Sequence, residues 1–149
     1  MRIVAALLAC LLLALPATAQ KRIALSFDDA PRGAGAFLDP DARAKKLTSA
    51  LKRAGVKQAV FFVNPGNIGQ PGHGDGAANL DRYVKAGHVL ANHSWSHPKL
   101  GNTDATVYLA DLDRAEAWLK ARPGYRPWFR FPFLDEGGKD KVKRDAIRA

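Results

Sequence analysis

The sequence predicts an α/β fold in which parallel strands alternate with helices. Short, continuous apolar runs, the pattern of strands covered on both faces, alternate with longer segments whose apolar residues recur at helical spacing. Glycine or proline separates most of these segments, as expected at turns and helix ends. Such alternation favours a parallel sheet whose strands are joined by right-handed crossovers. At 149 residues the chain has the size of one domain.

Residues 1–19 have the pattern of a secretory signal peptide. An arginine gives a positive start, Ile3–Leu15 is a run of thirteen apolar residues, and an Ala-x-Ala pattern ends at Ala19. The run is shorter than the roughly 20 residues of a membrane-spanning helix, which favours cleavage over an uncleaved anchor. Cys10 also gives the leader a faint likeness to a lipoprotein processing site. We therefore expect a secreted or periplasmic domain, residues 20–149, without stable membrane insertion.

The chain carries an excess of positive charge, with 23 lysines and arginines against 14 aspartates and glutamates, for a net charge of +9. Such an excess favours acidic partners. For an exported protein, anionic cell-wall polymers or lipid head groups fit better than nucleic acid. The excess is scattered along the chain, so charge alone identifies no partner, and we expect no binding of nucleic acid.

The first strand is predicted at Ile23–Phe27, and Asp28 and Asp29 follow it directly. A loop rich in proline and glycine comes next. Asp39-Pro40 then has the pattern of a helix start, with aspartate as the cap and proline at the first helical position, and this helix ends at Gly55. Carboxylates just past the C-terminal end of a parallel strand lie where α/β folds place their functional sites. A turn or a helix cap is the alternative role for such a pair.

The second strand is predicted at Gln58–Val63 and the third at His88–Ala91, both almost continuously apolar. Asn64–Gly76, a loop rich in glycine, carries His73, which we interpret as an exposed loop residue without a catalytic role. Ala77–Ala86 is predicted to be a short helix that a glycine closes. The third strand therefore leads directly into a segment rich in histidine.

A longer helix is predicted at Asp104–Ala121, and a fourth strand at Arg126–Phe131. This strand brings Arg130 to the same edge of the sheet as the other polar motifs. A last helix is predicted at Lys139–Arg148. The inward face of the long helix is assigned to Val107, Leu112, Ala115 and Leu119.

His93 and His97 are four residues apart, a spacing that places two imidazoles on the same side of one helical turn. A carboxylate from the end of the first strand would complete three protein ligands around a divalent metal. Three ligands leave a position open for water or a substrate oxygen, which distinguishes catalytic metal sites from structural ones. Histidine pairs with this spacing also occur without a metal. Considered with the carboxylates, the pair predicts a metal-dependent hydrolase.

Three motifs in this order resemble the polysaccharide deacetylase (NodB-homology) family of carbohydrate esterases. They are Ser26–Asp29, His93–His97 and Arg130–Phe133, and the resemblance extends over residues 21–138. It implies a distorted (β/α) barrel. It also implies hydrolysis of N-acetyl groups on a polysaccharide or oligosaccharide, with zinc as the metal and cobalt or another first-row ion as alternatives.

The resemblance also assigns roles to individual residues. It makes Asp29, His93 and His97 the metal ligands. Asp28 is then the general base toward water, whose pKa the ion lowers toward about 7. Arg130 orients Asp28, the backbone N–H of Phe133 stabilises the oxyanion, and Ser94 fixes the histidine loop.

The sequence departs from this family in its later part. No counterpart of the family's Asp-Trp region or of its Leu-x-His motif is found, and the four histidines are at positions 73, 88, 93 and 97. With four strands predicted, we expect the N-terminal half to two-thirds of a deacetylase barrel, which would associate through exposed strand edges. Two alternatives remain. One is a metal-retaining module that binds glycan without turnover, through Trp95 and Trp128. The other is a related amide hydrolase for a substrate that is not a sugar.

Overall fold

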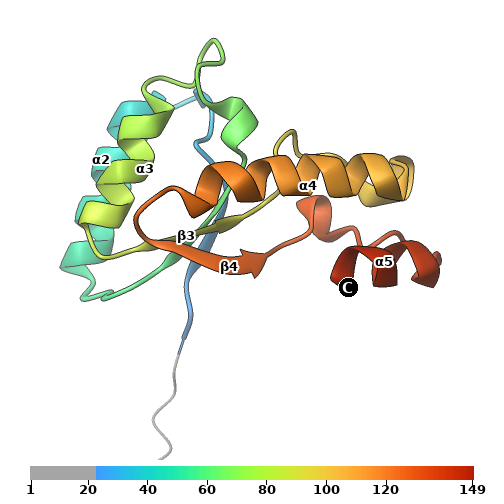
Figure 1. Ribbon diagram of the computed structural model, residues 1–149. Coiled ribbons are helices and arrows are strands. Elements are labelled where there is room, and N and C mark those ends of the chain that lie inside the picture. The colour runs from blue at the N-terminus through green and yellow to red at the C-terminus, as the bar shows by residue number, and fades with distance from the viewer. Residues whose placement is uncertain (1–22) are drawn as a thin grey trace, which may run out of the picture.

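The computed structural model describes residues 23–149, so the predicted signal peptide lies outside the described part. Within this range the four strands form one parallel sheet in the order β1-β2-β3-β4. Helices alternate with the strands, as the sequence predicts (Figure 1). The elements are β1 (Ser26–Ala30), α2 (Pro40–Arg53), β2 (Val60–Val63), α3 (Gly76–Lys85), β3 (Val89–Asn92), α4 (Ala105–Lys120), β4 (Tyr125–Phe129) and α5 (Lys141–Arg148).

The two central strands are buried and the two outer strands are not. Nearly every residue of β2 and β3 is buried, which explains their continuous apolar sequences. Most residues of β1 and β4 are exposed or half-buried, and Trp128 on β4 is 47% exposed. β4 also contains Pro127, which suits an edge strand because proline donates no ladder hydrogen bond. The predicted exposed edges are therefore present on both sides of the described sheet.

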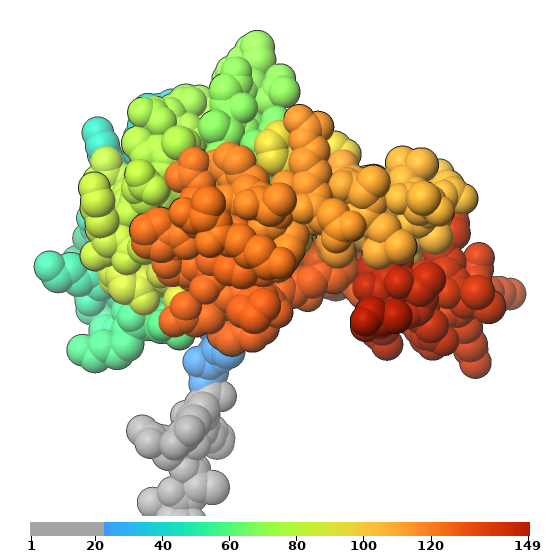
Figure 2. All heavy atoms as spheres, viewed as in Figure 1, coloured from blue at the N-terminus to red at the C-terminus, as the bar shows by residue number. Residues whose placement is uncertain are grey.

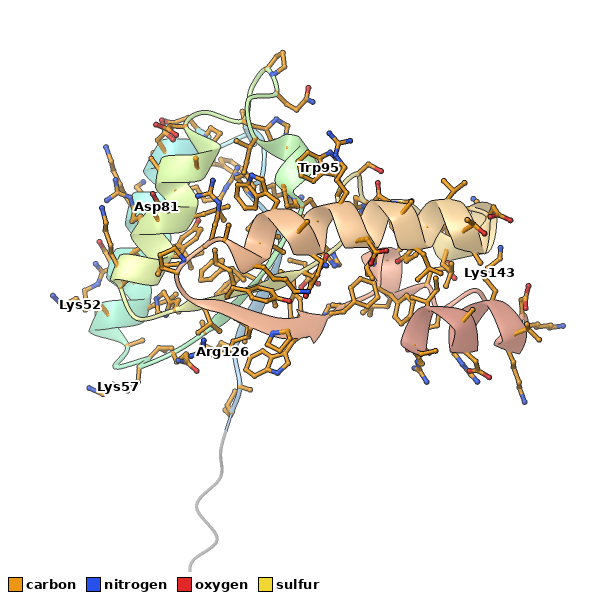
Figure 3. The ribbon with its side chains drawn as sticks, in the orientation of Figure 1. Lys52, Lys57, Asp81, Trp95, Arg126 and Lys143 are labelled. Carbon is orange, nitrogen blue, oxygen red and sulfur yellow. The ribbon has the colours of Figure 1, made fainter. Side chains whose placement is uncertain are left out.

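Helices α2 and α3 lie side by side, and α4 runs across β3 and β4 (Figure 1). The main core lies between the sheet and these helices. Its centre is an aromatic stack. The ring centroid of Phe61 lies 3.8 Å from that of Tyr83 and 5.0 Å from that of Phe27. Charged side chains such as Lys52 and Lys57 point away from this core (Figure 3). Burial of one face of each helix therefore holds the strands in place.

A second, smaller apolar cluster lies under the C-terminal segment. It consists of Tyr108 of α4, Ile147 of α5, and Leu100 and Phe131 from the connecting segments. Figure 2 shows that α5 and the start of α4 form a lobe beside the main body. Within residues 23–149, every helix is too short or too polar to span a bilayer.

Several details of the predicted elements are wrong, and the fourth strand is Tyr125–Phe129 rather than Arg126–Phe131. The first strand is Ser26–Ala30 rather than Ile23–Phe27, and Ile23 is 86% exposed. The register with β2 runs from Ser26 to Ala30, so Asp28 and Asp29 belong to the strand itself. In α4 the predicted Ala115 and Leu119 are buried, but Tyr108 is buried in place of the predicted Val107, which is 61% exposed. Because Val107 and Tyr108 are adjacent and both apolar, the sequence does not show which of them faces inward, and the larger side chain, Tyr108, occupies the buried position.

Helix α4 begins with a side-chain cap whose loss we expect to be measurable. Asp104 Oδ1 accepts hydrogen bonds from the backbone N–H of Thr106 at 2.8 Å and of Val107 at 3.4 Å. Replacing Asp104 with alanine leaves these donors without that partner, so the free energy of unfolding should fall by about 1 kcal/mol. Urea denaturation measures this change. The control is Asp113→Ala, which removes the same charge from an exposed position of α4 and should change stability by less than half as much.

Candidate metal centre

The candidate site lies at the C-terminal ends of β1, β3 and β4. Asp28 and Asp29 are the third and fourth residues of β1, His93 directly follows β3, and Arg130 directly follows β4. The backbone N–H of Arg130 donates to Asn92 O at 3.1 Å, so sheet pairing extends to the site itself. Parallel strands bring their carboxyl ends to one edge, and the three predicted motifs therefore meet in space.

Asp29, His93 and His97 form a compact set of possible metal ligands. Asp29 Oδ1 lies 3.0 Å from His97 Nε2 and 3.6 Å from His93 Nε2, and one ligand atom from each residue lies within 4.8 Å of the others. The His93 side chain is 2% exposed, while those of His97 and Asp29 are 25% and 40% exposed. The set is therefore anchored on the buried side and open to solvent on the other.

His93 is held in the tautomer that a metal ligand requires. Its Nδ1 lies 2.7 Å from the carbonyl oxygen of Arg130 and donates the hydrogen bond, which leaves the lone pair of Nε2 facing Asp29 and His97. Burial lowers the pKa of His93, and the hydrogen bond to Arg130 opposes that shift only in part. The imidazole is consequently neutral at pH 7, as metal binding needs.

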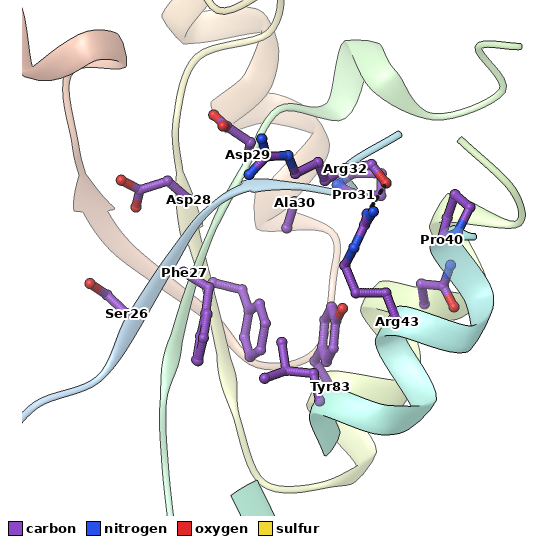
Figure 4. Close-up of a pocket in the computed structure, with 13 residues that line it drawn as sticks. Ser26, Phe27, Asp28, Asp29, Ala30, Pro31, Arg32, Pro40, Arg43 and Tyr83 are labelled. Carbon is purple, nitrogen blue, oxygen red and sulfur yellow. Dashed lines mark hydrogen bonds between the residues drawn. The ribbon is translucent and has the colours of Figure 1, made fainter. Parts of the chain in front are cut away.

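Asp28 faces the same space but is paired with Arg130. The Arg130 Nη1 donates to Asp28 Oδ1 at 2.7 Å and to Ser26 Oγ at 2.9 Å. The guanidinium also lies over the Phe62 ring, 4.2 Å from its centroid. Ser26 and Asp28 extend from one side of β1 while Phe27 extends from the other, toward α2 and α3 (Figure 4). These contacts fix the Asp28 carboxylate beside the ligand set.

A cavity of about 330 Å³ lies behind β1, between this strand and the helices (Figure 4). Phe27, Phe61 and Tyr83 form its apolar wall. Arg43 of α2 lies at its polar end, where its guanidinium donates to the carbonyl oxygens of Arg32, Gly33 and Leu38. Arg43 therefore fixes the loop that follows the two aspartates.

The segment from His93 to His97 is a loop, so the prediction of a helical turn is wrong. Ser94 and His97 have φ angles of 65° and 60°. The Ser94 Oγ accepts a hydrogen bond from the His97 backbone N–H at 3.2 Å, and the Ser94 N–H donates to Asn92 Oδ1 at 2.8 Å. The two imidazoles nevertheless lie close together, with ring centroids 4.9 Å apart.

Phe133 lies at the mouth of the site. Its ring centroid is 4.5 Å from that of His97, and the residue is 63% exposed. Its φ angle of 58° lies in the left-handed region. Besides the backbone N–H considered in the sequence analysis, the Phe133 side chain therefore packs on a predicted metal ligand.

Other residues support the site without having been singled out from the sequence. The Asn64 side chain donates to the carbonyl oxygens of His93 and Ser94, and Asp111 of α4 accepts from the same loop. Their positions in the sequence give no direct signal, since each acts through tertiary contact. His73 and His88 lie elsewhere, bonded to Pro71 O and to the Ala59 N–H.

The donor set fits a divalent transition metal. Two neutral imidazole nitrogens and one carboxylate oxygen are the chemistry that zinc and related ions bind in catalytic sites. The carbonyl that fixes the His93 tautomer is the usual outer partner of a ligating histidine. This fit agrees with the predicted ligands Asp29, His93 and His97.

Comparisons with known proteins agree with the geometry. A family model described as polysaccharide deacetylase matches residues 16–148. The chain is 30% identical over 125 residues to a peptidoglycan-N-acetylglucosamine deacetylase of Bacillus cereus, a match covering 81% of this chain and 39% of that protein. A chitin deacetylase of Colletotrichum lindemuthianum is 26% identical over 113 residues, covering 75% of this chain and 42% of that protein.

The solved structure of the peptidoglycan deacetylase PdaC from Bacillus subtilis has the same fold. It matches with a TM-score of 0.63 and 29% identity over 87% of this chain and 56% of that chain. This confirms the predicted fold, a distorted (β/α) barrel represented here by its N-terminal part. The chain spans less than half the length of the two curated relatives described above and about half of PdaC.

Proposed function

Because the chain belongs to the polysaccharide deacetylase family, we propose that it forms the metal-binding part of an enzyme that hydrolyses N-acetyl groups on a polysaccharide or oligosaccharide. The observation that carries this proposal is the convergence of three ligand atoms beside a carboxylate that an arginine holds. Amide hydrolysis needs a cation to stabilise developing negative charge and a base to activate water. The proposed metal ligands and the proposed base lie together at one edge of the sheet.

Asp29, His93 and His97 would hold the ion, which we propose to be zinc, with cobalt or another first-row ion as substitutes. A divalent ion at such a site acts as a Lewis acid toward a carbonyl and lowers the pKa of water toward about 7. The exposed side of Asp29 leaves room for water and substrate.

Asp28 acts as the general base in this proposal. Arg130 donates to Oδ1, which leaves Oδ2 to accept a proton from water. The Asp28 side chain is 38% exposed, so water reaches it. Arg130 is a positioning residue, since its second hydrogen bond to Ser26 fixes the direction of the guanidinium. The backbone N–H of Phe133 is the proposed donor to the oxyanion.

The proposed substrate is an N-acetylated glycan met outside the cytoplasm. The relatives described above are named for peptidoglycan and chitin, both polymers that carry N-acetyl groups. A secreted or periplasmic location follows from the predicted signal peptide at residues 1–19. The positive net charge of +9 suits an anionic cell-wall polymer.

Acetate release tests this proposal. We expect the purified chain loaded with zinc or cobalt to release acetate from N-acetylglucosamine oligomers, and we expect a chelator to stop it. Substrate pull-down by the metal-loaded chain without acetate would instead favour a glycan-binding module. Activity confined to small amides that are not sugars would favour the other amide hydrolase.

A further inference from the structure

The loop that carries both histidine ligands is attached to helix α4 through one carboxylate. Asp111 Oδ1 accepts hydrogen bonds from the backbone N–H of Trp95 at 2.8 Å and of Ser96 at 3.0 Å. Its Oδ2 accepts from the Ser96 Oγ at 2.6 Å and from the Ser96 N–H at 3.2 Å. All these donors belong to the three-residue stretch between His93 and His97. Asp111 therefore binds the loop midway between the two ligands.

This loop needs external support because its backbone is not relaxed. Ser94 and His97 are both in the left-handed region, which costs a residue other than glycine about 1 kcal/mol or more. Such conformations persist only when surrounding contacts determine them. The hydrogen bond from the His97 N–H to Ser94 Oγ lies within the loop and cannot fix the loop relative to the sheet. Asp111 supplies a fixed point on a helix of sixteen residues.

A second contact from the same helix holds the Trp95 side chain of the loop. The Arg114 guanidinium lies 3.9 Å from the Trp95 ring centroid, in cation–π geometry. Trp95 lies between α4 and the segment that follows β2 (Figure 3). Arg114 and Asp111 are three residues apart and so face the same side of α4. Helix α4 therefore contacts the loop through two neighbouring residues, Asp111 and Arg114.

His93 and His97 differ in how firmly the rest of the molecule holds them. His93 is buried, and the carbonyl of Arg130 fixes its ring. His97 is more exposed, and its ring packs on Phe133, which is itself exposed. The position of His97 relative to His93 thus depends on the loop between them. Asn64 holds the start of that loop, and Asp111 holds its middle.

We propose that Asp111 is a positioning residue that sets the separation of the two imidazoles and thereby the affinity and geometry of the metal site. This inference rests on the proposed function, because it assumes that Asp29, His93 and His97 bind a metal. Residues that orient metal ligands from outside typically contribute 10- to 100-fold in metal affinity. Asp111 would act on the ion only through the loop.

The test compares Asp111→Ala and Asp111→Asn with Asp113→Ala in the full chain, using Co²⁺ as the probe. Asp113→Ala removes the same charge from an exposed position on the same helix. We expect Asp111→Ala to weaken Co²⁺ binding at least tenfold and to change the visible absorption spectrum of the bound ion. Asp111→Asn keeps one oxygen for the backbone donors, so its affinity should lie between those of wild type and alanine variant.

Each outcome has a defined meaning. If Asp111→Ala and Asp113→Ala bind Co²⁺ within twofold of each other and give the same spectrum, Asp111 does not position the ligands. If the alanine variant does not fold, as judged by circular dichroism, the asparagine variant and Ser96→Ala decide by the same criteria. A wild-type chain that binds no Co²⁺ would overturn the metal site itself and with it this inference, a result distinct from equal binding by all variants.

Discussion

Replacing Asp29 with asparagine is expected to reduce metal affinity by more than about 100-fold. The carboxylate is the only anionic group among the three proposed ligands, and its Oδ1 lies 3.0 Å from His97 Nε2. An amide oxygen carries no net charge and is a poorer donor to zinc. Loss of a residue that only orients a ligand typically costs 10- to 100-fold, and loss of the ligand itself should exceed that range. Metal content after dialysis and competition titration with a chromophoric chelator measure the effect.

This substitution should leave the fold intact. Asp29 has a φ angle of 62°, a left-handed conformation that asparagine adopts as readily as aspartate. The matched control is Asp28→Asn, which makes the same chemical change one residue earlier and should retain the metal. Equal metal retention in the two variants would show that Asp29 is not a ligand. A loss confined to Asp29→Asn would support the assignment directly.

The sequence predicted which residues meet, but not how the chain brings them together. Asp28, Asp29, His93 and Arg130 were placed at strand ends by the alternation of strands and helices, and parallel pairing then assembles them at one edge. The spacing of His93 and His97 suggested a helical turn. The observed loop places the same two rings together by left-handed residues, a choice that spacing alone does not distinguish.

The contacts that support the site could not be predicted from sequence patterns. Asp111 lies fifteen residues from Ser96, on a helix whose exposed face carries several other charges, and nothing in its local sequence separates it from Asp113. Asn64 likewise appeared as the start of a loop, yet its side chain donates to the carbonyl of His93. Such roles come from tertiary packing. They become visible only when the distance between the helix and the loop is known.

Replacing Asp28 with asparagine is expected to lower the turnover number for acetate release by about 10²- to 10⁴-fold, the usual contribution of a general base. Asparagine keeps an oxygen that Arg130 can bind, so the geometry around Ser26 and Arg130 should persist while the proton acceptor is lost. Acetate release under saturating metal measures the change. Metal content, measured on the same samples, should equal that of wild type, which separates loss of the base from loss of the ion.

The control for this prediction is Ser26→Ala, which removes the second acceptor of Arg130 but keeps the Asp28 carboxylate. Its turnover should fall by much less than that of Asp28→Asn, because the 2.7 Å contact between Arg130 and Asp28 remains. An Asp28→Asn variant that retains more than a tenth of wild-type turnover would rule out this residue as the base. Since Asp28 and Asp29 are adjacent in one strand, the contrast between their variants separates two roles, one in turnover and one in metal binding.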